Sequence, residues 1–536
     1  MEQVRLFAAI ILSIVVFVGW NYLFPPAKPQ VDPAQTQVEE TLTQENGEAA
    51  APAVNIKPVA VVEEKIIVVD APLYHIEFTN RGAAVKRFEL KKYKETLKGD
   101  AFKNVVDEGV DRTFTLGFSK NAVPGIEKAL FEADQSSVSV GDSGATLSFR
   151  WVSDAGVEVV RTFAFAADSY NIDSSVVVRN GSGLALDGGV TVSVVGGTPE
   201  GRAVGFEGPS GYIDGTLENI KIKKIEDKNI FSGNVEWVAQ QTRYFMTAVV
   251  PEGKAGSTML LKDEAGIITN TVVIPTGVIQ PGAEAAIGMD IMAAPKSYSM
   301  LKKMNSSISQ VVNFGWFDII AKPCLSLMNL IHDKAIANYG IAIILLTILI
   351  KLLFWPLGNK SYRSMHEMKK LQPIMASIRE KYADDKQRMN QEVMNLYKTY
   401  KVNPMSGCLP LVVQMPIFFA LYRMLYSAVE LRHAPFFGWI TDLSAPDRLL
   451  EFGFSIPLMA DPAGIPVLTL LMGATMFLQQ KMSPSTGDPT QARMMMMMPL
   501  VMTFIFINFS SGLVLYWLVN NVLSISQQYY ITKKLS

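Results

Sequence analysis

The chain is poor in the residues that build catalytic and metal sites. Its 536 residues include only two cysteines, Cys324 and Cys408, and four histidines. Two cysteines form neither a disulfide framework nor a thiolate metal site. No segment matches a phosphate-binding loop or a nucleophile elbow. The sequence therefore predicts neither a cofactor nor an enzyme.

Charged residues are also scarce, at 18% of the chain, whereas hydrophobic residues make up 49%. Soluble proteins rarely combine these values, so we expect a membrane protein with sizeable soluble parts. The net charge of −1 gives no reason to expect a nucleic-acid partner, and no sequence-specific binding of nucleic acid is predicted.

The amino-terminal end contains an apolar run, Leu6–Trp20, that begins just after Arg5. A cleaved signal peptide is one interpretation, but no small-x-small cleavage site follows the run. Residues 1–24 are therefore predicted to be an uncleaved anchor with a cytoplasmic amino terminus. Residues 25–64 are rich in proline, alanine, glutamine, valine and glutamate without a steady period, which is typical of a flexible linker.

Residues 65–296 alternate apolar and polar side chains in short runs that turn residues separate. This pattern predicts a large all-β sandwich. His75 is its only histidine, and a scaffold that docks partners is favoured over a sugar or peptide groove. The expected strand runs are 65–69, 74–78, 146–152, 157–165, 170–179, 235–250 and 267–274.

The region 297–338 contains an apolar run, Val311–Ile331, that is interrupted by Asp318, Lys322 and Pro323. Such a run is too broken to cross a membrane. It predicts an interfacial amphipathic helix just before the next span.

Residues 339–536 contain five long apolar segments, which predict six spans when the anchor is added. The polar loop 359–402 carries ten basic residues against five acidic ones, whereas loop 433–462 is mainly acidic. The positive-inside rule then places the first loop and both termini in the cytoplasm and the β domain in the periplasm. The five segments are Tyr339–Leu357 and, approximately, 409–431, 463–478, 494–509 and 512–525.

Residues 359–404 are predicted to form a cytoplasmic helical hairpin. Apolar residues step by four and three positions in both Leu371–Tyr382 and Met389–Tyr400, as in a coiled-coil seam. Asp384 is expected to N-cap the second helix. The charged face is either a solvated surface beside anionic lipid or a docking surface for a ribosome, RNA or a targeting receptor. This face comprises Arg379, Asp384, Asp385, Lys386 and Arg388.

One bare charge, Lys351, lies inside the first apolar segment of this half. A lysine at the centre of a membrane helix costs about 2.5–3.5 kcal/mol, so it normally faces protein, a partner or water. Thr347 lies one turn earlier on the same face. Lys351 either lines a wet pocket or extends to the headgroups, because the cytoplasmic loop begins nearby.

Other polar residues in the spans have two interpretations. Arg423 and Glu430 lie two turns apart on one helix face, which favours a structural pair. Tyr516, Asn520, Ser524 and Gln527 lie along one side of the last apolar segment, and Gln414 and Gln480 could join the same lining. Each of these residues either lines a polar site around Lys351 or links helices to one another.

Two other functional classes predict features that are not visible. A transporter predicts inverted repeats and paired intramembrane charges. An intramembrane protease requires a Ser-His pair or a carboxylate dyad, and no predicted span contains a histidine. A transporter or channel with a periplasmic binding domain remains the alternative interpretation.

Several ordered motifs resemble the YidC family of membrane-protein insertases. The resemblance is dense over 320–535, and the anchor and β domain resemble the Gram-negative form. It implies a five-helix core around a hydrophilic groove, together with a periplasmic β-supersandwich. The motifs are 371–373 (LQP), 384–387 (DDKQ), 403–422 (NPMSGCLPLVVQMPIFFALY), 479–484 (QQKMSP) and 511–517 (SGLVLYW).

The resemblance further implies an insertase and chaperone of the bacterial inner membrane. It would move short hydrophilic segments of nascent membrane proteins through the groove and release their apolar segments into lipid. It would act with the ribosome, alone or with the Sec translocon. Lys351 occupies the place of a groove residue that is usually arginine, and lysine keeps the charge but loses the bidentate fork. Tyr516 and Trp517 would contact the passing segment.

Overall fold

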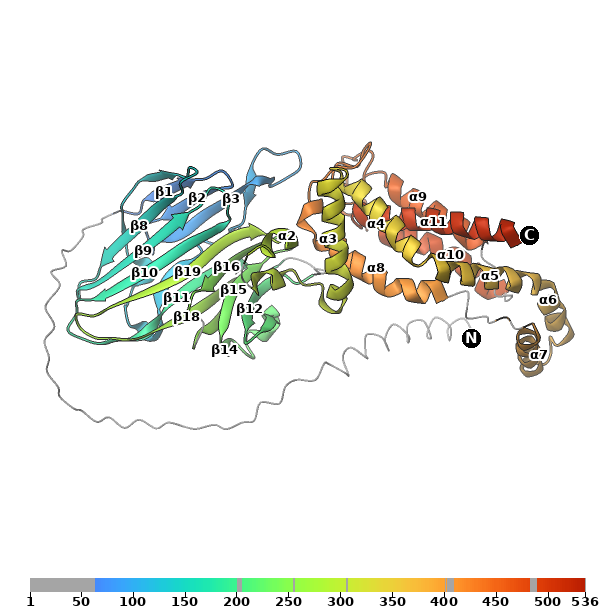
Figure 1. The fold of residues 1–536 in the computed structure, drawn as a ribbon, viewed down its shortest axis with the longest axis horizontal. Coiled ribbons are helices and arrows are strands. Elements are labelled where there is room, and N and C mark those ends of the chain that lie inside the picture. The colour runs from blue at the N-terminus through green and yellow to red at the C-terminus, as the bar shows by residue number, and fades with distance from the viewer. Residues whose placement is uncertain are drawn as a thin grey trace. The chain divides into compact units, whose positions relative to one another are not determined.

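The computed structural model describes residues 63–199, 205–253, 256–304, 307–400, 402, 409–482 and 489–535. The predicted anchor, nearly all of the linker and the motif residues 403–408 lie outside these ranges. The described chain forms a β domain, followed by a helical part (Figure 1).

The described residues of the β domain form three sheets. The largest has nine strands in the order β13-β12-β15-β16-β19-β10-β9-β8-β6, and two five-stranded sheets run β14-β17-β18-β11-β5 and β4-β3-β2-β1-β7. The strands are β1 (Ile66–Asp70), β2 (Tyr74–Thr79), β3 (Ala84–Lys94), β4 (Phe102–Asn104), β5 (Thr115–Phe118), β6 (Glu132–Ala133), β7 (Ser137–Ser139), β8 (Ala145–Val152), β9 (Val157–Phe165), β10 (Asn171–Asn180), β11 (Leu186–Gly197), β12 (Gly208–Ile213), β13 (Thr216–Asn219), β14 (Ile230–Ser232), β15 (Val235–Gln241), β16 (Phe245–Pro251), β17 (Thr258–Glu264), β18 (Ile267–Ile279) and β19 (Glu284–Pro295).

Alternating burial along the strands confirms the predicted β-sandwich. In β10, for example, every second side chain from Ile172 to Val178 is buried, so one face of the strand points into the core. The expected run 235–250 is two strands rather than one. It is broken by a tight turn in which the Thr242 amide donates to the Phe245 carbonyl, and β15 and β16 then pair in antiparallel fashion.

Inside the β domain, Arg161 and Lys296 are buried and Asp290 is half-buried. Burial lowers the pKa of Arg161 to about 9, and its guanidinium donates to the Ala83 and Phe114 carbonyls. Burial likewise lowers the pKa of Lys296 to about 8. On β19, burial raises the pKa of Asp290 to about 6, and the facing carboxylate of Asp173 adds to the shift.

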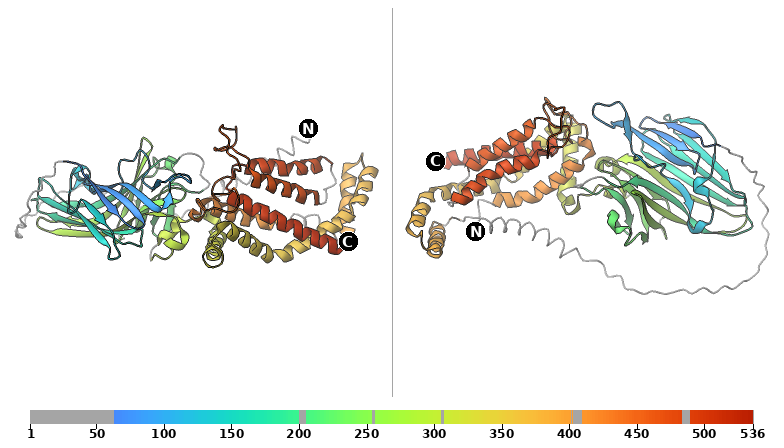
Figure 2. Two further views of the ribbon diagram at one scale, coloured as in Figure 1. Left: turned by 90° about the horizontal axis from the view of Figure 1, so that it is seen from above. Right: turned by 180° about the vertical axis from the view of Figure 1, so that it is seen from behind.

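The helical part begins right after β19. Its helices are α2 (Tyr298–Leu301), α3 (Asp318–Lys334), α4 (Tyr339–Leu353), α5 (Trp355–Lys370), α6 (Gln372–Lys381), α7 (Lys386–Thr399), α8 (Leu409–Ser427), α9 (Val467–Met482), α10 (Pro489–Phe506) and α11 (Ser511–Leu535). Within it, α11 packs against α4, α5, α8 and α9, and α10 packs beside α9 (Figure 2).

The predicted span 339–357 is not one straight helix. The chain breaks at Phe354, and Pro356 occupies the first turn of α5, a position that suits proline. Within the described ranges, no single helix is long and apolar enough to cross a membrane alone. Tyr339–Leu353 and Trp355–Lys370 qualify together, but they are bent by 65° relative to each other.

Helices α6 and α7 pack against each other around Leu371, Met375 and Leu396 (Figure 1). The observed packing differs from the predicted seam at the end of α7. Tyr397 packs inward and its hydroxyl donates to the Met375 sulfur at 3.1 Å, whereas Tyr400 is exposed because α7 has already ended at Thr399.

The predicted N-cap of α7 is wrong by one residue. Asp385, not Asp384, accepts a hydrogen bond from the Arg388 amide, at 2.9 Å. Because the helix begins at Lys386, Asp385 is the residue whose carboxylate can reach the third amide of its first turn.

Between the β domain and α4, the expected amphipathic helix appears as α3, and Pro323 lies inside it. Ala321, Leu325 and Met328 are buried on one face, whereas Ile319 and Leu330 are exposed. Placement at a membrane interface stays a prediction.

Candidate functional site

A small cavity lined by both polar and apolar side chains lies at the break between α4 and α5. Its volume is about 40 Å³, which is room for one to three water molecules. Three elements meet there: the broken helix pair, α8 and α11. The lining residues are Ile350, Lys351, Phe354, Leu357, Gly358, Tyr362, Val413, Gln414, Ile417, Asn520 and Gln527.

The ammonium of Lys351 is turned toward α11. Its Nζ donates to Ser524 Oγ at 2.6 Å, and that hydroxyl donates in turn to the Asn520 carbonyl at 2.7 Å. Tyr362 of α5 also forms a side-chain hydrogen bond with Ser524. The side chain therefore lines the cavity instead of running along the outside of its own helix.

No carboxylate neutralises this ammonium among the described residues. None of the residues that line the cavity is acidic, and no ion pair of Lys351 is found within 4.0 Å in the described ranges. A half-buried cation without a counter-ion attracts anions more strongly than one in bulk water, because the local dielectric is lower. The cavity is thus suited to a negatively charged group.

The cavity brings together three of the predicted lining residues: Lys351, Gln414 and Asn520. Thr347 is not among the lining residues, and its hydroxyl donates to the Ile343 carbonyl at 2.6 Å. Gln480, on α9, is not among the lining residues.

Tyr516 and Trp517 pack in the helical core beside this cavity. Tyr516 is only 3% exposed and is hydrogen bonded to Gln414. Trp517 meets the rings of Phe418 and Phe506 edge-on, at centroid distances of 4.5 Å and 5.1 Å. A passing segment would have to displace neighbours to reach either side chain.

The predicted pair between Arg423 and Glu430 is wrong. Arg423 donates to the Phe314 carbonyl at 3.2 Å, and Glu430 accepts from Ser297 at 3.0 Å and Asn329 at 3.2 Å. Two helical turns separate the pair by about 10 Å, and α8 ends at Ser427 before Glu430 is reached. Both side chains instead tie the end of α8 to segment 297–338.

The charged residues predicted for the hairpin lie on α6, α7 and the turn between them. Asp384, Asp385 and Arg388 are exposed, and the Arg388 guanidinium lies 5.5 Å from the Tyr382 ring centroid. Arg379 is half-buried on α6, and Lys386 begins α7. These positions leave both interpretations of the surface open.

The site residues expected from the sequence do not include Gly358 or Tyr362, which both line the cavity. Gly358 directly follows the expected end of the span at Leu357, and Tyr362 lies in residues 359–404, which are predicted to form the hairpin. The Trp355-Pro356 pair was the available signal, because proline in a first turn marks a new helix. Ser524 and Gln527 lie one and two turns after Asn520 on the same side of α11.

Comparison with known proteins identifies the family. A family model described as "YidC periplasmic domain" matches residues 66–327, and one described as "60Kd inner membrane protein" matches residues 331–536. The membrane protein insertase YidC of Pelobacter propionicus is 40% identical over 99% of both chains. That of Geobacter sulfurreducens is 40% identical over 99% of this chain and 98% of its own. The chain belongs to the YidC family of membrane protein insertases.

This insertase is a protein of the bacterial inner membrane with a periplasmic β domain, and its substrates are nascent membrane proteins. It is not an enzyme. A solved structure titled as an active YidC insertase with its first transmembrane domain resolved covers 88% of this chain and 93% of its own, at 19% identity. Its TM-score of 0.37 is too low to support an argument about helix arrangement.

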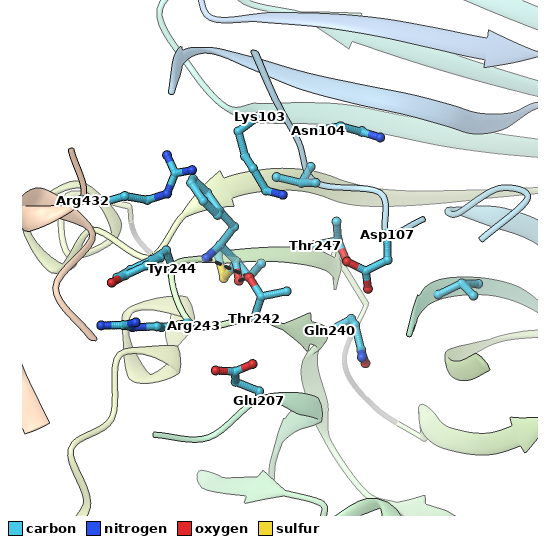
Figure 3. Close-up of a pocket in the computed structure, with 14 residues that line it drawn as sticks. Lys103, Asn104, Asp107, Glu207, Gln240, Thr242, Arg243, Tyr244, Thr247 and Arg432 are labelled. Atoms are coloured by element: carbon cyan, nitrogen blue, oxygen red, sulfur yellow. Dashed lines mark hydrogen bonds between the residues drawn. The ribbon is translucent and has the colours of Figure 1, made fainter. Parts of the chain in front are cut away.

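The periplasmic domain of the insertase contains a larger cavity, of about 250 Å³. Glu207, Gln240 and Thr247 line it (Figure 3). Burial raises the pKa of Glu207, whereas the Gln240 Oε1 atom has no hydrogen-bond donor within the described structure. None of its described lining residues is a histidine, and it shares no residue with the cavity at Lys351.

Proposed function

We propose that the cavity at Lys351 is the closed form of a hydrophilic groove that receives the polar segment of a client membrane protein. The observation that supports this proposal is an uncompensated ammonium, held among polar side chains of α8 and α11. An acidic residue in the client's leading tail would meet Lys351 as the tail enters.

The physical obstacle is about 30 Å of hydrocarbon, which a hydrated tail cannot cross unaided. A groove that holds water lets the tail remain hydrated over part of this depth, so the barrier falls without a complete pore. The cavity has room for water but not for a polypeptide, so a client must widen it. The following apolar segment then moves into lipid, driven by its own hydrophobicity and by the membrane potential.

The proposed topology has six spans, of which five form the core around this groove. The core helices are α4 with α5, α8, α9, α10 and α11. Both termini would be cytoplasmic, because the basic loop that contains α6 and α7 follows the positive-inside rule.

Hairpin α6–α7 is proposed to dock the machinery that delivers clients. Its exposed charged residues offer a surface for the ribosome, a targeting receptor or anionic lipid, and the Sec translocon would share some clients. Deleting Pro373–Tyr400 should reduce ribosome recruitment while the core keeps its folded state in detergent. Unchanged recruitment beside a collapsed core would assign the hairpin to folding instead.

Site-specific crosslinking tests the groove directly. A photoreactive residue at Asn520 should crosslink to a stalled client, whereas one at Val522, 45% exposed on the same helix, should crosslink mainly to lipid. Equal client yields from both positions would place the route outside the cavity. Tyr516 and Trp517 are further positions, and crosslinks from them would show that the packed core opens.

A further inference from the structure

The polar residues on one side of α11 form a frame around the cavity. Ser524 is 2% exposed and Gln527 is 1% exposed, so both side chains are enclosed by protein in the closed state. Each bonds to a part of the cavity wall that another helix supplies. Ser524 holds the ammonium, and Gln527 holds the broken helix.

The Ser524 hydroxyl acts both as a hydrogen-bond donor and as an acceptor. The hydroxyl proton goes to the Asn520 carbonyl, so the oxygen lone pairs remain for donors. Lys351 Nζ supplies one such donor, at 2.6 Å, and Tyr362 provides a further side-chain hydrogen bond. The position of the ammonium is therefore fixed by a side chain 173 residues away in sequence.

Gln527 joins α11 to the start of α5. Its Nε2 donates to the Trp355 carbonyl and to Asn359 Oδ1, both at 3.0 Å. Gly358 makes this approach possible, because a Cβ there would lie 2.8 Å from both polar atoms of the Gln527 carboxamide. Phe354, Leu357 and Gly358, which form that wall of the cavity, are thereby held against α11.

We infer that Ser524 and Gln527 are positioning residues of the insertase groove, with separate tasks. Ser524 sets the preference for clients with acidic tails by presenting the Lys351 ammonium to the cavity. Gln527 sets the width of the groove, because its two hydrogen bonds must yield before α5 moves away from α11. This inference rests on the proposed function of the Lys351 cavity.

The test for Ser524 compares two clients that differ only in an aspartate or an asparagine in the translocated tail. In the full-length insertase in proteoliposomes, Ser524→Ala should reduce the preference for the acidic tail about threefold to tenfold, since a hydrogen bond to a charged group is lost. Ser524→Thr keeps the hydroxyl and should restore the preference. An unchanged preference in Ser524→Ala would overturn the assignment.

The test for Gln527 measures distance. With Cys324 and Cys408 replaced by serine, spin labels are placed at the exposed positions Arg363 of α5 and Ser526 of α11. Gln527→Leu and Gly358→Ala should both broaden the distance distribution and change the insertion rates of the two clients by equal factors. Gln528→Leu is the matched control, because Gln528 bonds to the Met482 carbonyl on α9 instead.

The groove function of Lys351 and the positioning roles of Ser524 and Gln527 can be refuted independently of each other. If Lys351→Leu itself leaves the preference for the acidic tail intact, the groove function is wrong. If Lys351→Leu abolishes the preference while the Ser524 and Gln527 variants behave like the parent, the groove stands and only the positioning roles are wrong. A distance distribution unchanged in both Gln527→Leu and Gly358→Ala would overturn the role of Gln527.

Discussion

Replacing Lys351 by leucine removes the charge in the cavity while roughly keeping the volume of the side chain. An ammonium and a carboxylate 4 Å apart attract by about 4 kcal/mol at an effective dielectric constant near 20. The cavity admits water, and the ammonium already donates to Ser524, so we expect about a third of this attraction to act as the tail enters. A loss of about 1.4 kcal/mol corresponds to tenfold slower insertion.

The assay follows a client with a short acidic periplasmic tail in proteoliposomes and measures its protease-protected fragment over time. Lys351→Leu should slow this client about tenfold and leave the asparagine-tailed version nearly unchanged. Lys351→Arg should insert both clients like the parent, because it keeps the charge.

A second cation on the neighbouring helix provides the control. Arg423→Leu removes a charge that bonds to the Phe314 carbonyl outside the cavity, so it should not change the preference between the two tails. Equal rates for both tails in stably expressed Lys351→Leu and in the parent would refute the electrostatic role of Lys351.

Three further predictions concern stability. Asp385→Ala should destabilise α7 by about 1 kcal/mol, seen as faster amide hydrogen exchange in its first turn, while Asp384→Ala should leave exchange unchanged. The pKa of Lys296 falls from 10.5 to about 8 on folding, so the unfolded chain binds more protons between these values and the free energy of unfolding rises with pH there. This rise amounts to about 3 kcal/mol, and denaturant titrations of Lys296→Met at several pH values should no longer show it. The pKa of Asp290 is raised to about 6, so the domain's free energy of unfolding falls as pH rises from 3.8 to 6. Asp290→Asn should therefore stabilise the domain at pH 7.5. The expected gain is about 1 kcal/mol after allowance for solvent screening.

Local pattern was enough to predict the β domain. Alternation with a period of two identified the runs near β1, β2, β8, β9, β10 and β18, which lie within a residue or two of the observed strands at most ends. The long strands β3, β11 and β19 were not among the expected runs. The turn inside 235–250 was missed, since Thr242 to Tyr244 carry neither glycine nor proline.

The site was predictable only in part. Lys351 can be selected as a site residue from the sequence alone, because a lysine inside an apolar run is too costly to leave facing lipid. Its partner Ser524 lies on another helix, and sequence spacing reports only neighbours on the same element. The pair expected between Arg423 and Glu430 failed for the same reason. Spacing placed them on one face, but better partners came from segment 297–338.

The polar residues of α11 show why helix periodicity alone could not assign roles. Asn520, Ser524 and Gln527 follow one side of the helix toward the cavity, whereas Asn521 and Gln528 follow another and bond to Thr475 and Met482 of α9. In lipid, polar contacts and close packing replace hydrophobic burial as the force that joins helices, so the second group is sufficiently explained as interhelical linkage. Only the first group meets a charge that has no counter-ion among the described residues. That difference, which no spacing rule contains, is what distinguishes the proposed functional face of α11 from its structural one.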